Sequence, residues 1–305
     1  MKSESTRLVV RPEQDGERLD VVLAGSTDLS RRAARRLVAS GAVWRNGESL
    51  RVQSKSLDAG DVLDLLLPCH ELGVPATPDL TMPDVLLEDG WLMVVDKPAG
   101  LLSQPAESDP RELALDQLLL MGLALREGRR PYIRLVHRID RLTSGAVLFA
   151  RNPQALRPLT RAWADGEVDR RYLAVVEGEP DTDTFSIEEP LARDQKHRWR
   201  FEVSTDGAAA HTRVSVLSRL ASGCAVVECR LVTGRTHQVR VHLAHLGHPV
   251  VGDRLYGARL TPEVGRPLLH AARLSLPHPQ TGETLTVESP VPDDMATFLN
   301  ELPSG

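Results

Sequence analysis

Asp140 lies in a charged loop that leads directly into an apolar strand. The loop begins at Val136 and places Arg138 and Arg141 on either side of the carboxylate, and the apolar run continues to Ala150. Because nearby cations favour the ionised form of a carboxylate, we expect Asp140 to be charged at neutral pH. Such a group can act as a nucleophile or a general base. The same pattern also fits a surface ion pair or a turn cap, and composition alone does not separate these alternatives.

Two other arrangements of chemical groups occur in the sequence. Four histidines follow one another at spacings of five, three and three residues, which could place zinc ligands on one helix face: His237, His242, His245 and His248. No cysteine or acidic residue stands within that run, so we expect no metal site. Ser144 lacks the Gly-x-Ser-x-Gly elbow of many hydrolases, so a serine–histidine–aspartate triad is not favoured either.

The elements that must position Asp140 belong to a mixed domain over 84–305. Short apolar runs alternate there with a few helical segments, and proline and glycine punctuate them frequently. This pattern favours an α+β fold. Gly145 supplies the bend between loop and strand, because glycine tolerates backbone conformations that a side chain forbids. Residues 68–83 contain four prolines and no periodicity, so we expect a linker over 69–83.

A smaller domain is expected over 1–68. A short helix is predicted near 18–23, and Ser30 can cap a second helix over 31–39 because its hydroxyl accepts an N–H of the first turn. That helix carries apolar residues on one side and four arginines on the other: Arg31, Arg32, Arg35 and Arg36. Gly41 fits its end. An Asn46-Gly47 turn and a closing strand over 62–67 follow.

The charge distribution is more informative than the net charge of −5. Residues 30–55 hold seven Arg and Lys against one acid, and residues 125–171 hold eleven Arg against five acids. Two local basic tracts can bind a polyanion even on a mildly acidic protein, although solvated surface charge would give the same pattern.

The remaining bulk features exclude several classes of protein. The polar N-terminus does not resemble a signal peptide, and no apolar run approaches the length that a membrane span needs. The three cysteines form no CxxC pair. We therefore expect a cytoplasmic protein that does not associate with a membrane, and we expect a monomer.

The segment around Asp140 resembles the signature of the RluA-type pseudouridine synthases. His137-Arg138-Ile139-Asp140 followed by Thr143-Ser144-Gly145 matches HRLDxxTSG with one departure, Ile139 in place of Leu. Three further segments resemble that family in its order: Asp96 to Gly100, Arg171 to Gly178 and Thr233 to His242. Arg171 stands where the family usually has Lys. The resemblance covers about residues 84–292.

The first domain resembles the S4 RNA-binding domain over about residues 7–67. Five short pieces match in the right order: Arg18-Leu19-Asp20, Ser30-Arg31, Gly41-Ala42-Val43, Asn46-Gly47 and Gly60-Asp61. In that family the second helix presents a basic face to structured RNA, which Arg31, Arg32, Arg35 and Arg36 would do here. The expected architecture is thus a small S4-like domain followed by a synthase domain with a mixed, largely antiparallel sheet.

The resemblance implies a role for several residues. Asp140 would be the essential carboxylate, Arg235 would pair with it, and Tyr172 would lie against the uracil ring. Val239 would form an apolar wall of the pocket, and Arg138 would enter the space that a flipped-out uridine leaves. Plainer interpretations stay open: phosphate contacts for Arg235 and Arg138, and core positions for Tyr172 and Val239.

The reaction implied is the isomerisation of specific uridines in RNA, which requires no cofactor and no metal. An attached S4 domain suggests 23S (large-subunit) ribosomal RNA or a ribosome precursor as the partner. Transfer RNA is the alternative substrate. A second alternative is a catalytically silent RNA-binding factor for ribosome assembly, although the presence of Asp140, Tyr172 and Arg235 together argues against it.

Overall fold

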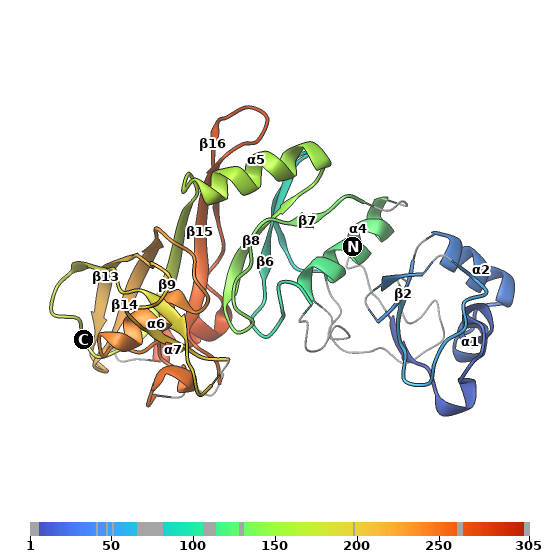
Figure 1. Ribbon diagram of the computed structural model, residues 1–305, viewed down its shortest axis with the longest axis horizontal. Coiled ribbons are helices and arrows are strands. Elements are labelled where there is room, and N and C mark those ends of the chain that lie inside the picture. Colours follow the sequence, from blue (N-terminus) through green and yellow to red (C-terminus); the bar gives the residue numbers. More distant parts are fainter. Residues whose placement is uncertain are drawn as a thin grey trace. The chain divides into compact units, whose positions relative to one another are not determined.

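The structure is a computed structural model that describes residues 6–40, 42–46, 48–50, 52–65, 82–105, 114–127, 131–197, 199–260 and 265–301. The chain divides into two compact units, and Figure 1 labels many of their helices and strands. Unit 1 comprises residues 1–84 and 102–135, and unit 2 comprises residues 85–101 and 136–305. Most of the expected linker over 69–83 lies outside the described residues, so that expectation stays a prediction.

Unit 1 contains a small antiparallel sheet in the order β1-β4-β2-β3. Its strands are β1 (Thr6–Val9), β2 (Val43–Arg45), β3 (Glu48–Ser49) and β4 (Val62–Leu65). A 3-10 turn, η1 (Pro12–Gln14), precedes the helices α1 (Leu19–Ser26) and α2 (Arg31–Ser40). The segments α4 (Leu115–Glu127) and β7 (Arg134–Leu135) also belong to this unit.

The helices of unit 1 form for the reasons that the sequence indicated. The Ser30 hydroxyl accepts a hydrogen bond from the Ala33 N–H at 3.3 Å, which confirms the predicted cap of α2. Leu19 and Leu23 of α1 and Val38 of α2 are fully buried, so the apolar faces of both helices contribute to the core. Gly41, the predicted end of α2, lies outside the described residues.

Unit 2 is built on one large mixed sheet in the order β10-β13-β14-β9-β15-β8-β6-β5, with β16 paired to β15. Its strands are β5 (Val85–Glu88), β6 (Leu92–Lys97), β8 (Ser144–Ala150), β9 (Asp169–Glu177), β10 (Thr184–Ile187), β13 (Thr212–Leu220), β14 (Cys224–Leu231), β15 (Leu269–Pro277) and β16 (Thr284–Glu288). Only β15 and β8 run parallel among these pairs. The mixed, largely antiparallel sheet that the resemblance predicted is thereby confirmed.

The remaining elements of unit 2 are helices and one separate hairpin. The helices are α5 (Pro153–Ala164), α6 (Gln238–His245), α7 (Asp293–Glu301) and the 3-10 turn η2 (Arg254–Tyr256). The hairpin joins β11 (Leu191–Arg193) to β12 (Phe201–Val203). Asn152 caps α5 by accepting from the Ala155 N–H at 2.9 Å, and Pro153 takes the first helical position, where proline needs no N–H partner.

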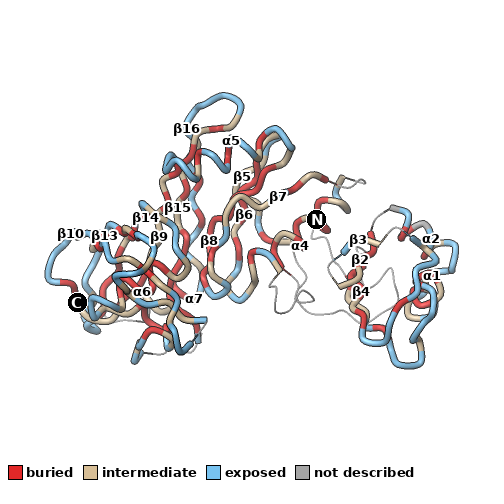
Figure 2. Tube along the Cα trace, viewed as in Figure 1, coloured by how far each residue is buried: buried red, intermediate tan, exposed pale blue. Residues whose placement is uncertain are grey.

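The middle of the large sheet is the most buried part of unit 2. All seven residues of β8 are buried, and Figure 2 shows the buried stretches of β8 and its neighbours. A strand buried on both faces gives a firm base for the loop that precedes it, which ends at Thr143. No described helix is long and apolar enough to cross a membrane.

Candidate active site

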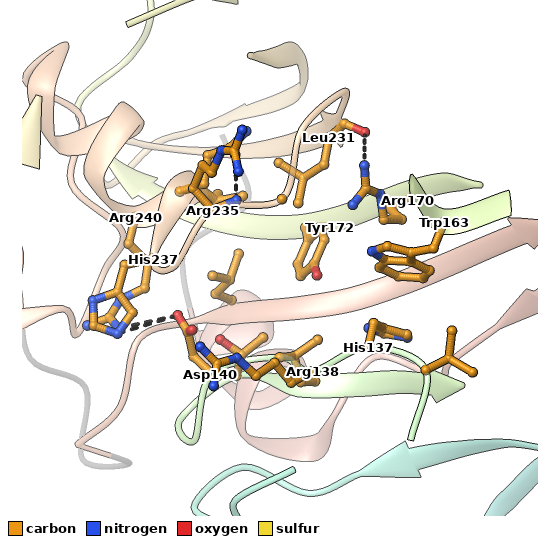
Figure 3. Close-up of a pocket in the computed structure, with 17 residues that line it drawn as sticks. His137, Arg138, Asp140, Trp163, Arg170, Tyr172, Leu231, Arg235, His237 and Arg240 are labelled. Carbon is orange, nitrogen blue, oxygen red and sulfur yellow. Dashed lines mark hydrogen bonds and ion pairs between the residues drawn. The ribbon is translucent and has the colours of Figure 1, made fainter. Parts of the chain in front are cut away.

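A cavity of about 250 Å³ opens in unit 2 where the loop before β8 meets β9 and the start of α6. Figure 3 shows its labelled side chains, with Asp140, His237 and Arg240 together at one end and Tyr172 between them and Trp163. The cavity brings together five residues singled out in the sequence: Arg138, Asp140, Tyr172, Arg235 and Val239.

The bend before β8 places Asp140 at this cavity. The Thr143 N–H donates to the Asp140 carbonyl at 3.1 Å, which closes a tight turn. Gly145 has φ of +116°, and a Cβ atom there would lie 2.4 Å from the backbone carbonyl oxygen of Ala271 in β15. Only glycine fits such a position, because β8 and β15 approach closely where they run parallel.

Asp140 pairs with Arg240 and not with Arg235. The Arg240 Nη1 atom lies 3.4 Å from Asp140 Oδ2, and His237 Nε2 lies 3.9 Å from the same oxygen. Arg235 is exposed, and its Nε donates to the Ala209 carbonyl at 3.0 Å. The prediction that Arg235 pairs with Asp140 was therefore wrong, although Arg235 does line the cavity.

Arg240 is held in place by a second carboxylate. It donates to both oxygens of Asp253, at 2.6 Å and 2.9 Å, and both side chains are buried. Burial alone would lower the pKa of Arg240, but Asp253 and Asp140 together raise it. Since Asp253 fixes the guanidinium, Arg240 can face Asp140 without losing its position when the pocket fills.

The choice between Arg235 and Arg240 depends on where α6 begins. Both arginines belong to one motif, but Arg235 lies in the loop before the helix and Arg240 lies in its first turns. His237 caps the helix with φ of +58°, a left-handed conformation that is uncommon for a residue other than glycine. Val239 and Val241, the apolar neighbours of Arg240, are both buried, and they are the sequence signal that could have indicated a buried position for Arg240.

His237 is tied into the site through Tyr256. The Tyr256 hydroxyl accepts from the Phe201 N–H at 3.1 Å and lies 2.7 Å from His237 Nδ1. Because the hydroxyl accepts from Phe201, its own hydrogen can donate to Nδ1, which favours the tautomer with hydrogen on Nε2. Burial lowers the pKa of His237, so a neutral ring with an N–H toward Asp140 is favoured.

Tyr172 and Val239 form the apolar side of the cavity. Both pack in one core cluster, with Val239 almost fully buried and Tyr172 partly buried against it. Burial raises the pKa of Tyr172 to about 12, and the charge of Asp140 acts in the same direction. The phenol is therefore neutral at physiological pH, and its ring can present a flat face to a base.

A three-layer stack that sequence reasoning missed lies at the other end of the cavity. The rings of His137 and Trp163 stack with centroids 4.0 Å apart, and the Arg170 guanidinium lies 4.9 Å from the Trp163 ring centroid. Arg170 also donates to the carbonyls of Leu231 and Val232 at the end of β14. His137 also connects the loop to β8, because its Nε2 accepts from the Leu148 N–H at 3.1 Å.

Lys97 connects the preceding motif to the Asp140 loop. Its fully buried Nζ donates to the carbonyls of Pro98, Leu101 and Arg141, at 2.9, 2.8 and 3.1 Å. An ammonium has three N–H donors, so these carbonyls use all of them. The Asp96 to Gly100 motif thus supports the loop that carries Asp140.

The predicted basic face of α2 is partly engaged within unit 1. Arg31 and Arg35 donate to Asp20 Oδ2 at 3.0 Å and 2.7 Å, and Arg18 donates to Oδ1 at 3.1 Å. The Asp20 side chain is fully buried, which by itself raises its pKa, but the three guanidinium groups hold the pKa well below its usual range.

The outer parts of this basic face remain accessible. The Arg31 side chain is 51% exposed and the Arg35 side chain 46%, and Arg32 is exposed. The side chain of Arg36 lies outside the described residues. The proposed contact of these arginines with RNA stays a prediction.

The two alternative chemistries have no support in unit 2. Ser144 Oγ lies 2.9 Å from His270 Nδ1, but both groups are buried, and the other ring nitrogen of His270 faces a backbone carbonyl. His242 likewise lies between the Thr212 hydroxyl and the Glu189 carbonyl. In the described part of the chain, no group of three or more His, Cys, Asp or Glu residues could hold a metal ion.

Comparison with known proteins identifies the class that this fold and cavity define. The RNA pseudouridylate synthase family matches residues 91–245, and the S4 domain matches residues 17–63. The chain therefore belongs to the RNA pseudouridylate synthase family and is an isomerase that acts on RNA.

Several relatives are similar over nearly their whole length. The chain is 37% identical to the RNA pseudouridine synthase YlyB of Bacillus subtilis, with 95% of each chain covered. It is 34% identical to the ribosomal large subunit pseudouridine synthase D of Xanthomonas campestris, covering 99% of this chain and 94% of that protein.

Solved structures agree with the fold. The human RNA pseudouridylate synthase domain containing 4 superposes with a TM-score of 0.59 at 24% identity, over 71% of this chain and 92% of that one. The human RNA pseudouridylate synthase domain containing 1 superposes with a TM-score of 0.57 at 23% identity, over 76% of this chain and 100% of that one.

Proposed function

We propose that this enzyme isomerises specific uridines of large-subunit ribosomal RNA, with Asp140 as the catalytic carboxylate. The observation that carries the proposal is the position of Asp140 between the buried Arg240–Asp253 pair and the open cavity. The carboxylate is about one quarter exposed, so it is accessible to a ligand in that cavity.

The isomerisation breaks the N1–C1′ bond of uridine and forms a C5–C1′ bond, while one proton leaves C5 and one joins N1. No electron or water is exchanged with the surroundings, so Asp140 can act as a nucleophile or a base without a cofactor. Arg240 places a positive charge beside the carboxylate when RNA excludes water from the cavity. Tyr172 supports the face of the free uracil while it turns.

A uridine within a stacked helix cannot bring its C1′ atom to Asp140, so the base must leave the stack. The cavity of about 250 Å³ offers a place for one base between Tyr172 and the residues around Asp140. Arg138 is exposed at the same cavity. Its planar guanidinium can stack on the neighbouring bases and fill the space that the uridine leaves.

The assignment to large-subunit ribosomal RNA rests on relatives and on the S4 domain. Two relatives are named ribosomal large subunit pseudouridine synthase D. One is from Xanthomonas campestris and is 34% identical, and the other is from Xylella fastidiosa and is 36% identical. The S4 match over 17–63 adds a second RNA-binding module to the synthase domain. Arg235, exposed at the mouth of the cavity, is suited to contact a phosphate of the bound strand.

Mapping pseudouridine in ribosomal and transfer RNA from cells with and without this gene tests the proposal. We expect defined large-subunit uridines to lose the modification, and the intact gene to restore it where an Asp140→Asn copy does not. Loss in transfer RNA alone would overturn the ribosomal assignment. No loss in either RNA would favour a binding-only assembly factor, and rescue by Asp140→Asn would overturn the role of Asp140.

A further inference from the structure

A second hollow lies directly beside the cavity that contains Tyr172. Its volume is about 360 Å³, and it shares Asp140, His237 and Arg240 with that cavity. Its other walls include Trp199 and Leu142, and all of these residues belong to unit 2. Asp140 therefore stands on the border between two adjoining spaces, only one of which the target uracil can occupy.

Trp199 is an unusual residue to find on this wall. It is 64% exposed, more than any other large hydrophobic side chain in the described part of the chain. Leu142, on the same wall, is 38% exposed. Exposed apolar side chains that gather at one hollow are typical of a binding surface, because exposure of apolar surface to water is unfavourable and a bound partner removes it.

The β11–β12 hairpin holds Trp199 in a defined place. Asp194 Oδ1 accepts from the N–H groups of Lys196 and His197, and the Asp194 N–H donates to the Arg200 carbonyl at 3.0 Å. The His197 ring meets the Trp199 ring edge-on, with centroids 5.4 Å apart. These hydrogen bonds join Asp194 to Lys196, to His197 and to Arg200, which follows Trp199 in the chain.

The same hairpin is connected to the catalytic end of the cavity. Phe201 donates its N–H to the Tyr256 hydroxyl, and its ring lies 5.9 Å from the His237 ring. The Arg200 guanidinium lies 5.7 Å from the Tyr256 ring centroid. These contacts connect the two residues that follow Trp199 to His237 and Tyr256.

Charge at the rim matches a polyanion. Arg254 and Arg141 both line the hollow and are exposed. An aromatic platform flanked by arginines is the combination with which proteins bind unpaired nucleotides, by stacking the base and neutralising the phosphate.

We propose that this hollow binds the base of a nucleotide next to the target uridine, stacked on Trp199. The inference rests on the proposed function, because it places the target uracil in the cavity beside Tyr172. A polynucleotide whose target sugar meets Asp140 must continue to either side of it, and the second hollow adjoins Asp140. The enzyme would then hold two unstacked bases, with a preference for a purine in the second site because its larger ring stacks better.

Short RNA probes test this site on the full chain. Each probe carries one uridine, one fluorescent 2-aminopurine directly 3′ or 5′ to it, and abasic residues elsewhere, so that only these two bases can stack. We expect 2-aminopurine to be quenched on binding in one of the two orders. Trp199→Ala should remove that quenching and raise Kd about tenfold, which corresponds to about 1.4 kcal/mol. Trp199→Phe should give quenching and a Kd between those of the wild type and those of Trp199→Ala.

Trp91→Ala is the matched control, because Trp91 lies against His278, outside the walls of both hollows. It should leave quenching and Kd unchanged. Replacing 2-aminopurine by an abasic residue should weaken binding to the wild-type chain but not to Trp199→Ala. The difference between these two effects measures the interaction between the base and the Trp199 ring directly. Thermal unfolding of each variant shows that it is folded.

Equal quenching and Kd in the wild type and Trp199→Ala would overturn the site, as would equal losses in Trp91→Ala. These outcomes do not depend on the RNA mapping described above. If mapping shows no ribosomal target while Trp199 quenches the probe, the proposed substrate fails and the stacking site stands. If mapping succeeds and quenching does not depend on Trp199, only the stacking site fails.

Discussion

Asp20 in unit 1 and Asp140 in unit 2 both lie beside arginines, but their surroundings differ in burial and in contact distance. Asp20 is fully buried and accepts from three guanidinium groups at 2.7 to 3.1 Å. Asp140 is about one quarter exposed, and its contacts to Arg240 and His237 are 3.4 and 3.9 Å long.

The difference separates a structural carboxylate from one that can react. Every short contact to Asp20 lowers its basicity and fixes its position, so it joins α1 to α2 and has no accessible oxygen. Asp140 keeps accessible oxygens, because Arg240 donates its short hydrogen bonds to Asp253 instead. A carboxylate beside arginines in sequence therefore says little by itself, and the saturation of its oxygens distinguishes the two roles.

Replacing each aspartate by asparagine should separate the two roles most clearly. Asp140→Asn keeps the shape of the side chain and removes its charge, so we expect kcat for pseudouridine formation to fall at least about a thousandfold, with RNA affinity retained. Single-turnover assays and filter binding measure the two quantities. Asp20→Asn is the control, and a comparable loss of kcat there would contradict the distinction.

Substitutions of Arg240 and of Arg235 should also differ in their effect on kcat. Arg240→Gln removes the charge beside Asp140, and we expect kcat to fall about a hundredfold. Arg235→Gln should leave kcat within a few-fold and raise KM, because Arg235 is exposed and bonded to a backbone carbonyl. The reverse order of effects on kcat would restore Arg235 as the partner of Asp140.

Asp20→Asn should instead destabilise unit 1, by about 2 kcal/mol, since it leaves the buried end of a three-arginine cluster uncompensated. The pKa of Asp20 is lower in the folded chain than in the unfolded chain. Its stabilisation is therefore fully present above about pH 4, the usual unfolded value, and is lost as the pH falls through the folded value.

Hydrogen exchange of α1 and α2 at pH values from 3 to 7 measures this effect on unit 1 separately. In the wild type, the protection of α1 and α2 should fall at the acid end of this range. In Asp20→Asn, the protection should be lower at pH 7 and should change less with pH. Identical pH profiles in the two proteins would show that Asp20 does not supply the acid sensitivity.

The smallest expected effect concerns the salt dependence of RNA binding. If Arg32 contacts a phosphate, Arg32→Glu should reduce the slope of log K against log salt by about 1. Arg31→Glu should also lower stability, because Arg31 is bonded to Asp20. An unchanged slope for Arg32→Glu would argue against RNA contact by this face of α2.

Local features of the fold were predictable from sequence, because neighbouring residues determine them. The Ser30 cap and α2 depend on a hydroxyl three residues from the N–H that it binds. The mixed sheet and the position of Asp140 at a cavity followed from the family motifs. Gly145 was recognised as a bend, although the close approach of Ala271 that requires it became visible only in the structure.

The partners of the charged groups were not predictable, because they come from distant parts of the chain. Arg240 is selected over Arg235 by Asp253 and by the left-handed residue His237 that starts α6. Trp163 meets His137 only because α5 packs near the loop before β8. Asp20 and Asp140 gave similar sequence patterns, and they are distinguished in the structure by burial and by the distances to their partners.

The place of β15 in the sheet sets the time at which the enzyme can first act. Although β15 comes late in the chain, it lies between β9, which carries Tyr172, and β8, which follows Asp140. A growing chain that ends before Leu269 already contains Asp140 and Arg240, yet it lacks the strand that pairs with both β8 and β9. During synthesis the strands beside the active site can therefore pair into one sheet only after β15 has left the ribosome.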